Sequence, residues 1–250
     1  MKNTIVSLVF LMLIPLVNFG QNTPSDEETN KTSWEFDIAP YVWFSGIKGD
    51  IGFREQSVPV NAKFKDILNN LTFGGMLHAE ANKGKWTIIS DLLYINARKE
   101  ARFDGIIEQA AVEIDQFVWE LGAGYKVINY EDFLFVDGLF GVRYFGLGPQ
   151  IEVDQQNVLD KNLNFIDPYF GVRMRTVKEK WTNSVRFDVG GLGIGSEISW
   201  KLVFLIGYNF NELLSLHAGY QGYNVHYKGD NSLDYNVYTG GFLTGLNFHF

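Results

Sequence analysis

The sequence of 250 residues predicts an all-β chain that forms one closed, antiparallel transmembrane β-barrel of about ten strands. Apolar residues alternate with small or polar ones at a period of two along most of the chain, which is the pattern of strands with two different faces. Tight turns alternate with long polar connections, as in barrels that cross a membrane. There is no cysteine, and after residue 20 no apolar run reaches the roughly 18 residues of a membrane helix.

The first 20 residues are predicted to be a signal peptide. A short basic start precedes an almost wholly apolar run from Ile5 to Phe19, and Gly20 and Gln21 fit a cleavage point. Residues 21–32 are polar and acidic and lack an apolar period, so they are predicted to be a disordered lead-in. The barrel is therefore expected to occupy residues 33–250.

The first strand of the barrel is predicted to begin near Trp34, and Pro40, which cannot donate a ladder hydrogen bond, indicates a strand end or a locally interrupted pairing. Residues 46–71 are expected to be a structured loop with two β-like runs, 47–53 and 57–64, and a helical turn at 65–71. The remaining strands are predicted at residues 72–82, 86–97, 111–127, 133–147, 164–177, 181–192, 198–209, 213–226 and 236–250.

Four tight turns, at 82–85, 128–132, 177–180 and 209–212, imply ten strands with both ends of the barrel sequence on one side of the membrane. Twelve strands would result if the 47–64 hairpin also crossed the membrane, and eight is a further alternative. The glycine-rich run at 190–195 resembles a phosphate loop, but no helix follows it. It is predicted to be a loop at the barrel rim.

The aromatic face of each strand is predicted to be the outer one, because the narrow lumen of a ten-stranded barrel cannot hold rings from every strand. The opposite face would then line the lumen with charge. Its predicted members are Glu35, Asp37, Glu80, Asp91, Glu120, Lys126, Asp137, Arg143, Asp167, Arg173, Arg175, Arg186, Asp188, Glu197 and Lys201.

Two interpretations of this lumen remain open. Paired charges could form a network that fills the barrel, since a lone buried charge is very costly. Alternatively, rings of charge could select ions or small polar solutes along a path. Arg173, Arg175 and Arg186 lie on neighbouring strands and could hold an anion, although the nearby carboxylates favour internal pairing.

Catalytic and metal sites are not predicted. His78, His217, His226 and His249 are too scattered to form a readable metal site, and no cofactor is expected. Ser215 and His217 share a face, but neighbours at that spacing on one strand rarely point at each other, so the chain is expected not to be an enzyme. The net charge of −8 is not clustered, which argues against nucleic acid as a partner.

The signal peptide, the alternation, the loop asymmetry and the final aromatic residues together resemble small outer-membrane β-barrel proteins. Gly245, Phe248 and Phe250 are similar to the assembly signal of these barrels, whereas Leu243 stands where a polar residue is more usual. Residues 64–73 with 80–86, and 186–196 with 206–208, are similar to a broad group of uncharacterised bacterial barrels. The resemblance implies a location in the bacterial outer membrane, with membrane lipid and the barrel-assembly machinery as partners.

The sequence therefore predicts a non-enzymatic outer-membrane barrel with a charge-lined, largely plugged lumen, serving envelope integrity or surface interaction. A narrow pore for small polar solutes or ions is the alternative. A membrane-embedded lipid-modifying enzyme is the second alternative.

Overall fold

The computed structural model describes residues 33–53, 56–69, 71–102, 109–153, 156–160, 163–229 and 233–250. The predicted signal peptide (1–20) and lead-in (21–32) lie outside these residues. The elements are β1 (Glu35–Phe53), β2 (Gln56–Ala62), α2 (Phe64–Asn69), β3 (Leu71–Lys83), β4 (Trp86–Arg102), β5 (Gln109–Tyr130), β6 (Leu134–Val153), β7 (Gln156–Asp160), β8 (Leu163–Lys178), β9 (Trp181–Gly190), β10 (Ile198–Asn209), β11 (Leu214–Gly229) and β12 (Leu233–His249).

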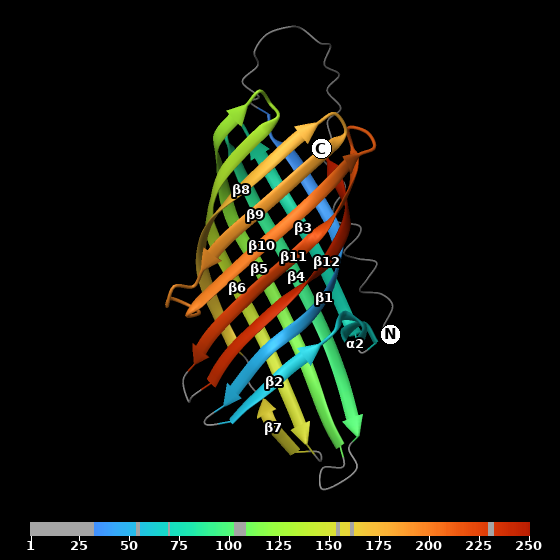
Figure 1. Ribbon diagram of the computed structural model, residues 1–250, viewed down its shortest axis with the longest axis vertical. Helices are drawn as coiled ribbons and strands as arrows, with labels where there is room; N and C mark the ends of the chain where they lie inside the picture. The colour runs from blue at the N-terminus through green and yellow to red at the C-terminus, as the bar shows by residue number, and fades with distance from the viewer. Residues whose placement is uncertain are drawn as a thin grey trace. The chain divides into compact units, whose positions relative to one another are not determined.

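Among the described residues, ten strands form a closed antiparallel barrel in the order β12-β11-β10-β9-β8-β6-β5-β4-β3-β1, and β12 pairs with β1 to complete the ring (Figure 1). The closing pairs run from Asp37 opposite His249 to Phe53 opposite Leu233. β2 pairs with β1 and β7 with β6, both outside the ring. The predicted closed barrel of ten strands is confirmed, and the alternatives of twelve and eight are not needed.

The two rims of the barrel differ, as predicted. Turns of two to four residues join β3 to β4, β5 to β6, β8 to β9 and β10 to β11, and we call this end the short-turn rim. Gly84 and Glu179 adopt positive φ angles of 59° and 54° in two of these turns, as tight hairpins require. The other end, with the remaining connections, is the long-loop rim.

The outer surface of the barrel is apolar. Phe170 on β8 is 59% exposed, Phe242 on β12 is 71% exposed, and both alternate with buried inward-facing residues. Exposed rings follow the short-turn rim: Trp86, Tyr130, Phe133, Trp181, Phe210, Phe248 and Phe250. An apolar band with an aromatic girdle is the exterior of a transmembrane β-barrel of the outer-membrane type. The described part of the chain contains no helix long and apolar enough to span a membrane.

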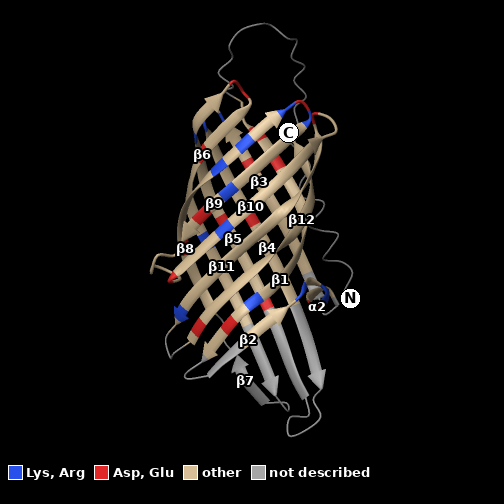
Figure 2. Cartoon of the chain, viewed as in Figure 1, with Lys and Arg blue, Asp and Glu red and all other residues tan. Residues whose placement is uncertain are grey.

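Acidic and basic residues occur along the strands of the wall (Figure 2), and those near the middle of the barrel are buried on its inner face. The half of the interior beside the long-loop rim is different, because it holds a cluster of buried apolar side chains. We call this the apolar cluster: Trp43, Ile67, Leu93, Ile95, Val118, Phe145, Leu147, Leu163, Phe165, Tyr223, Val225, Leu233 and Leu243. The expectation that charge lines the whole lumen is therefore wrong for this half.

The wall opens between β1 and β3. These strands pair from Glu35 opposite Asn82 to Pro40 opposite Leu77, and among the described residues the ladder stops there. Beyond Gly46, β1 pairs with β2 instead. α2 follows β2, and its Phe64 packs edge-on against Phe44 of β1 at 5.0 Å.

The segment 46–71 therefore differs from the structured loop that the sequence predicted. Residues 47–53 continue β1 and pair with β12, and 56–62 form β2. The predicted helical turn is present as α2. Pro40, which lacks an amide hydrogen, stands at the last β1–β3 pair, so the sequence signal for an interrupted ladder was correct.

The wall is also uneven in height. β9 has 10 residues and β5 has 22. The connection to β10 therefore follows a short strand. In this connection, the Ser196 amide and hydroxyl both donate to the Asp167 carboxylate, each at 2.7 Å. This places the glycine-rich run in a tight connection between strands, as predicted.

Candidate functional site

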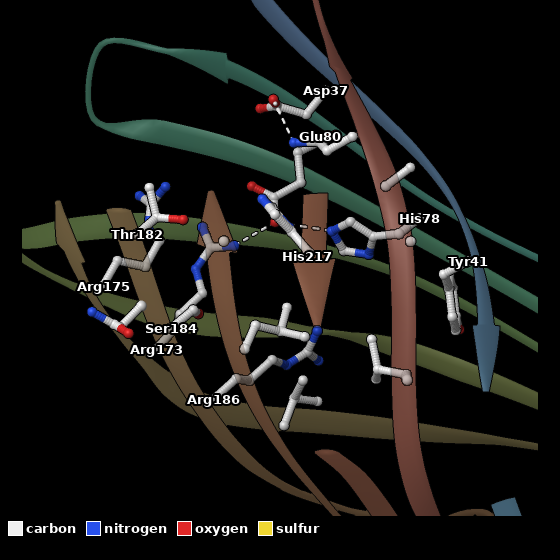
Figure 3. Close-up of a pocket in the computed structure, with 18 of the residues that line it drawn as sticks. Asp37, Tyr41, His78, Glu80, Arg173, Arg175, Thr182, Ser184, Arg186 and His217 are labelled. Carbon is white, nitrogen blue, oxygen red and sulfur yellow. Dashed lines mark hydrogen bonds and ion pairs between the residues drawn. The ribbon is translucent and has the colours of Figure 1, made fainter. Parts of the chain in front are cut away.

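The half of the lumen beside the short-turn rim contains two layers of paired charges and one sizeable cavity of about 270 Å³ (Figure 3). These side chains come from the inward face of each strand, because the residues that alternate with them point outward and form the apolar exterior.

The central cluster consists of Glu120, Arg143, Arg186, Asp188 and Lys201, all at most 6% exposed. Arg143 donates to Glu120 through Nε at 3.1 Å and Nη2 at 2.8 Å, and its Nη2 also reaches Asp188 at 2.7 Å. Arg186 Nε donates to Asp188 at 2.9 Å. Glu120 on β5 also contacts Arg186 on β9 and Lys201 on β10, so the cluster joins strands that are not neighbours in the ring.

Tyr169 lies against the central cluster. Its ring is 5.0 Å from the Arg143 guanidinium and 5.3 Å from that of Arg186, and its hydroxyl donates to Glu120 at 3.3 Å. A Cβ on Gly122 would lie 2.0 Å from this hydroxyl, and one on Gly141 would lie 2.8 Å from it. Both glycines therefore leave the space that the phenol occupies.

The lower cluster consists of His78, Glu80, Asp91, Asp137, Arg173 and Arg175. Arg173 on β8 bonds Asp137 through Nε at 3.0 Å and also bonds Glu80 on β3. Arg175 Nη2 reaches Asp137 at 3.1 Å. His78 lies between two carboxylates, with Nε2 3.1 Å from Glu80 and Nδ1 3.0 Å from Asp91, and the Tyr41 hydroxyl donates to Asp91 at 3.0 Å.

Apart from His78, the two clusters contain equal numbers of acidic and basic side chains. Their carboxylates are Glu80, Asp91, Glu120, Asp137 and Asp188, and their basic side chains are Arg143, Arg173, Arg175, Arg186 and Lys201. Removing one partner from such a buried set leaves an uncompensated charge, which costs about 3–5 kcal/mol. The network is thus organised for mutual pairing in the lumen.

A third group lies where the barrel closes, beside the short-turn rim. Ser215 Oγ on β11 is 3.0 Å from His249 Nε2 on β12 and 3.1 Å from His217 Nε2. The other nitrogen of His249, Nδ1, bonds Asp37 on β1. The amides of Asn82 and Asn247 each donate to Asp37 at 3.2 Å. This closure group therefore ties together the last two strands and the first.

The sequence did not reveal this group. Ser215 and His217 do contact each other, contrary to expectation, and His249 and Asp37 come from the opposite ends of the barrel sequence. The order serine, imidazole, carboxylate is that of a nucleophilic triad. However, Ser215 is fully buried and is not among the residues that line the cavity.

Some of the predicted lumen residues lie outside these groups. Asp167 is buried and holds the β9–β10 turn. Lys126 lies 5.1 Å from the Phe135 ring, and Glu35 and Glu197 are exposed near strand ends. His226 faces Asp234 near the long-loop rim, far along β11 from the closure group. No set of three or more His, Cys, Asp or Glu residues in the described ranges could hold a metal ion.

The cavity reaches from the short-turn rim to the central cluster. One wall comes from β8, β9 and β10 and carries the basic side chains, while the facing wall carries Asp37, His78, Glu80, Asp91, His217 and His249. Figure 3 shows Arg173, Arg175 and Arg186 on one side of the space and His78, Glu80 and Tyr41 on the other. Side-chain exposures of 32% for His249 and 24% for Asp37 show that solvent reaches this end.

The chain is similar in fold to several solved structures. They include Ail of Yersinia pestis (10% identity, 87% of this chain and 98% of that chain covered, TM-score 0.37) and the translocator domain of the autotransporter NalP from Neisseria meningitidis (12%, 86% and 88%, 0.40). Another is OmpT, an outer membrane protein of Vibrio cholerae (9%, 87% and 98%, 0.30). No protein-family model and no curated protein matches the chain.

Proposed function

We propose that this protein is a non-enzymatic barrel of the bacterial outer membrane whose lumen is occluded, and that its long-loop rim serves surface interaction or envelope integrity. The observation that carries the proposal is the apolar cluster. Phe165 on β8 stacks on Tyr227 of β11 at 4.5 Å and on Phe145 of β6 at 4.9 Å. Trp43 on β1 packs against Tyr223 on β11 at 5.6 Å. Phe145 and Phe165 lie on neighbouring strands, whereas Tyr223 and Tyr227 come from β11, so the stacked rings extend from one part of the wall to another across the lumen.

The charge balance of the central and lower clusters supports the same proposal. A pore that selects ions presents rings of one sign to the solute. Here each acid of the two clusters is engaged by a base, a histidine or a tyrosine. The membrane lipid around the barrel and the machinery that assembles barrels are the expected partners, the latter through the strand ending in Phe248 and Phe250.

Planar-bilayer conductance tests the proposal. The wild-type barrel should give no reproducible single-channel steps, whereas the double variant Phe145→Ala and Phe165→Ala should conduct, because it removes two stacked rings from the occluded half. Phe170→Ala is the matched control, since it removes a lipid-facing ring from the same strand. Regular steps from the wild-type protein would refute occlusion and favour the narrow pore, for which the cavity beside the short-turn rim is the supporting feature.

The absence of enzymatic activity is a separate proposal. The fully buried Ser215 should not react with a fluorophosphonate probe when the barrel is folded, and incubation with phospholipid or lipopolysaccharide should yield no product by mass spectrometry. Labelling that disappears in Ser215→Ala would instead favour the lipid-modifying enzyme.

A further inference from the structure

The basic side chains of the cavity present a surface that most of their counter-ions do not cover. Arg173, Arg175, Arg186 and Lys201 all line the cavity. Of their carboxylate partners, Glu120, Asp137 and Asp188 do not line it, whereas Glu80, the second partner of Arg173, does. The wall formed by β8, β9 and β10 therefore faces the cavity with positive charge.

The acids on the facing wall have their bonds directed elsewhere. Asp37 is engaged by His249 and two asparagine amides, and Asp91 by His78 and Tyr41. Glu80 is engaged by His78 and Arg173. The carboxylates on this wall thus already accept hydrogen bonds from neighbouring residues. The opposite wall has more hydrogen-bond donors than acceptors.

Two of these donors lack a partner. A guanidinium carries five N–H donors. Arg173 is 5% exposed and its Nη2 is buried without a hydrogen-bond partner, as is the Nε of Arg175. A buried donor without an acceptor costs about 1–3 kcal/mol, and more when it is charged. Both nitrogens belong to guanidinium groups that line the cavity, so a rotation of either group would offer its unpartnered N–H to an anion bound there.

Neutral donors lie beside them. Thr182 and Ser184 on β9 line the same wall, and Figure 3 shows them next to Arg175 and Arg173. Their place in the chain explains this, because β8 and β9 pair with Arg175 opposite Ser184. Two guanidinium groups with adjacent hydroxyls match the acceptor-rich outline of a carboxylate or a phosphate.

We propose that the cavity is a binding site for a small, soluble molecule carrying an oxyanion, a carboxylate or a phosphate, that enters from the short-turn rim and is held by Arg175 and Arg173. The volume of about 270 Å³ suits a small metabolite-sized solute. The site does not depend on occlusion of the long-loop half, because an anion can bind in an open or a closed lumen. The conductance test of occlusion and the test of anion binding therefore have independent outcomes.

The test is a titration of the folded barrel in a maltoside detergent, which carries neither phosphate nor carboxylate. Inorganic phosphate and acetate are added in separate series, and ethylammonium serves as a cationic probe. The readout is the NMR resonance of the Arg175 Nε–H group, assigned by its loss in Arg175→Gln. Both oxyanions should shift it saturably, and ethylammonium should not. Arg175→Gln should weaken phosphate binding at least tenfold, followed by calorimetry.

Lys178→Gln is the matched control. It removes the same charge from the same strand at an exposed position that does not line the cavity, so affinity should stay within twofold of the wild type. Heat-dependent mobility on gels verifies that each variant is folded. The proposal is overturned if neither oxyanion gives a saturable shift, or if Arg175→Gln and Lys178→Gln bind phosphate equally. Binding of lysophosphatidylglycerol without binding of the soluble anions would also overturn it, in favour of a lipid headgroup.

Discussion

At the scale of single residues, the lumen depends on small side chains as much as on charged ones. Tyr169 can lie against both arginines because Gly141 on the neighbouring strand β6 and Gly122 on the next strand β5 carry no Cβ. In a sequence these glycines are indistinguishable from the many others. The contact between Tyr169 and its two glycines therefore required the three-dimensional arrangement, whereas the inward direction of Arg143 and Asp137 followed from period two.

Gly122→Ala tests this arrangement. The added methyl group would meet the Tyr169 hydroxyl, so we expect a loss of about 1–3 kcal/mol in the free energy of unfolding, as for other overpacked sites. Gly138→Ala is the control, because a Cβ at that position meets nothing within 4 Å. Urea titration followed by tryptophan fluorescence measures both. Equal stability of the two variants would contradict the role of Gly122.

At the scale of elements, α2 packs against β1 near the place where β1 and β3 part. Its Ile67 is buried in the apolar cluster and the adjacent Leu68 is 52% exposed. Unpaired strand edges are costly at membrane depth, because lipid offers no hydrogen bonds. The helix lies in the segment between the two parted strands and contributes Ile67 to the interior.

Ile67→Ser should therefore destabilise the barrel by about 2–4 kcal/mol, since it opens a cavity and buries a hydroxyl. Leu68→Ser changes the neighbouring residue of the same helix and should cost within about 0.5 kcal/mol, as surface substitutions do. The midpoint of heat-induced loss of the compact form on gels compares them. Equal midpoints for the two variants would mean that the burial of Ile67 in α2 does not stabilise the barrel.

At the scale of the whole molecule, the buried ion pairs should make stability nearly independent of salt. Exposed charges are screened over about 10 Å at 0.1 M salt, but charges shielded from solvent are screened much less. We expect the free energy of unfolding to change by less than about 0.5 kcal/mol between 50 and 500 mM sodium chloride. A larger loss, measured by urea titration at both concentrations, would mean that water and ions reach the network.

The same scale shows what the sequence could predict. Alternation and turn lengths predicted the barrel, its ten strands and which residues of each strand point outward. They could do so because lipid favours apolar side chains and the lumen favours polar ones at neighbouring positions. They did not reveal the apolar cluster, since an inward Phe145 and an outward Phe140 differ only in position. The closure group was also out of reach, because Asp37 and His249 meet only when the ring closes. Segment 46–71 was misjudged because its first run extends β1 against β12 and its second run pairs with β1 outside the ring.

Because the strands differ in length, the barrel wall is taller on one flank than on the other. If β9, with 10 residues, is just long enough to cross the bilayer, β5 continues for 12 more. At about 3.4 Å per residue this is roughly 40 Å of strand standing clear of the lipid on one flank. The connection that follows β9 bears two exposed apolar residues, Leu192 (56%) and Ile194 (76%). A molecule that reaches the long-loop rim would therefore meet a taller wall on the side of β5 and would have easier access from the side of β9 and β10.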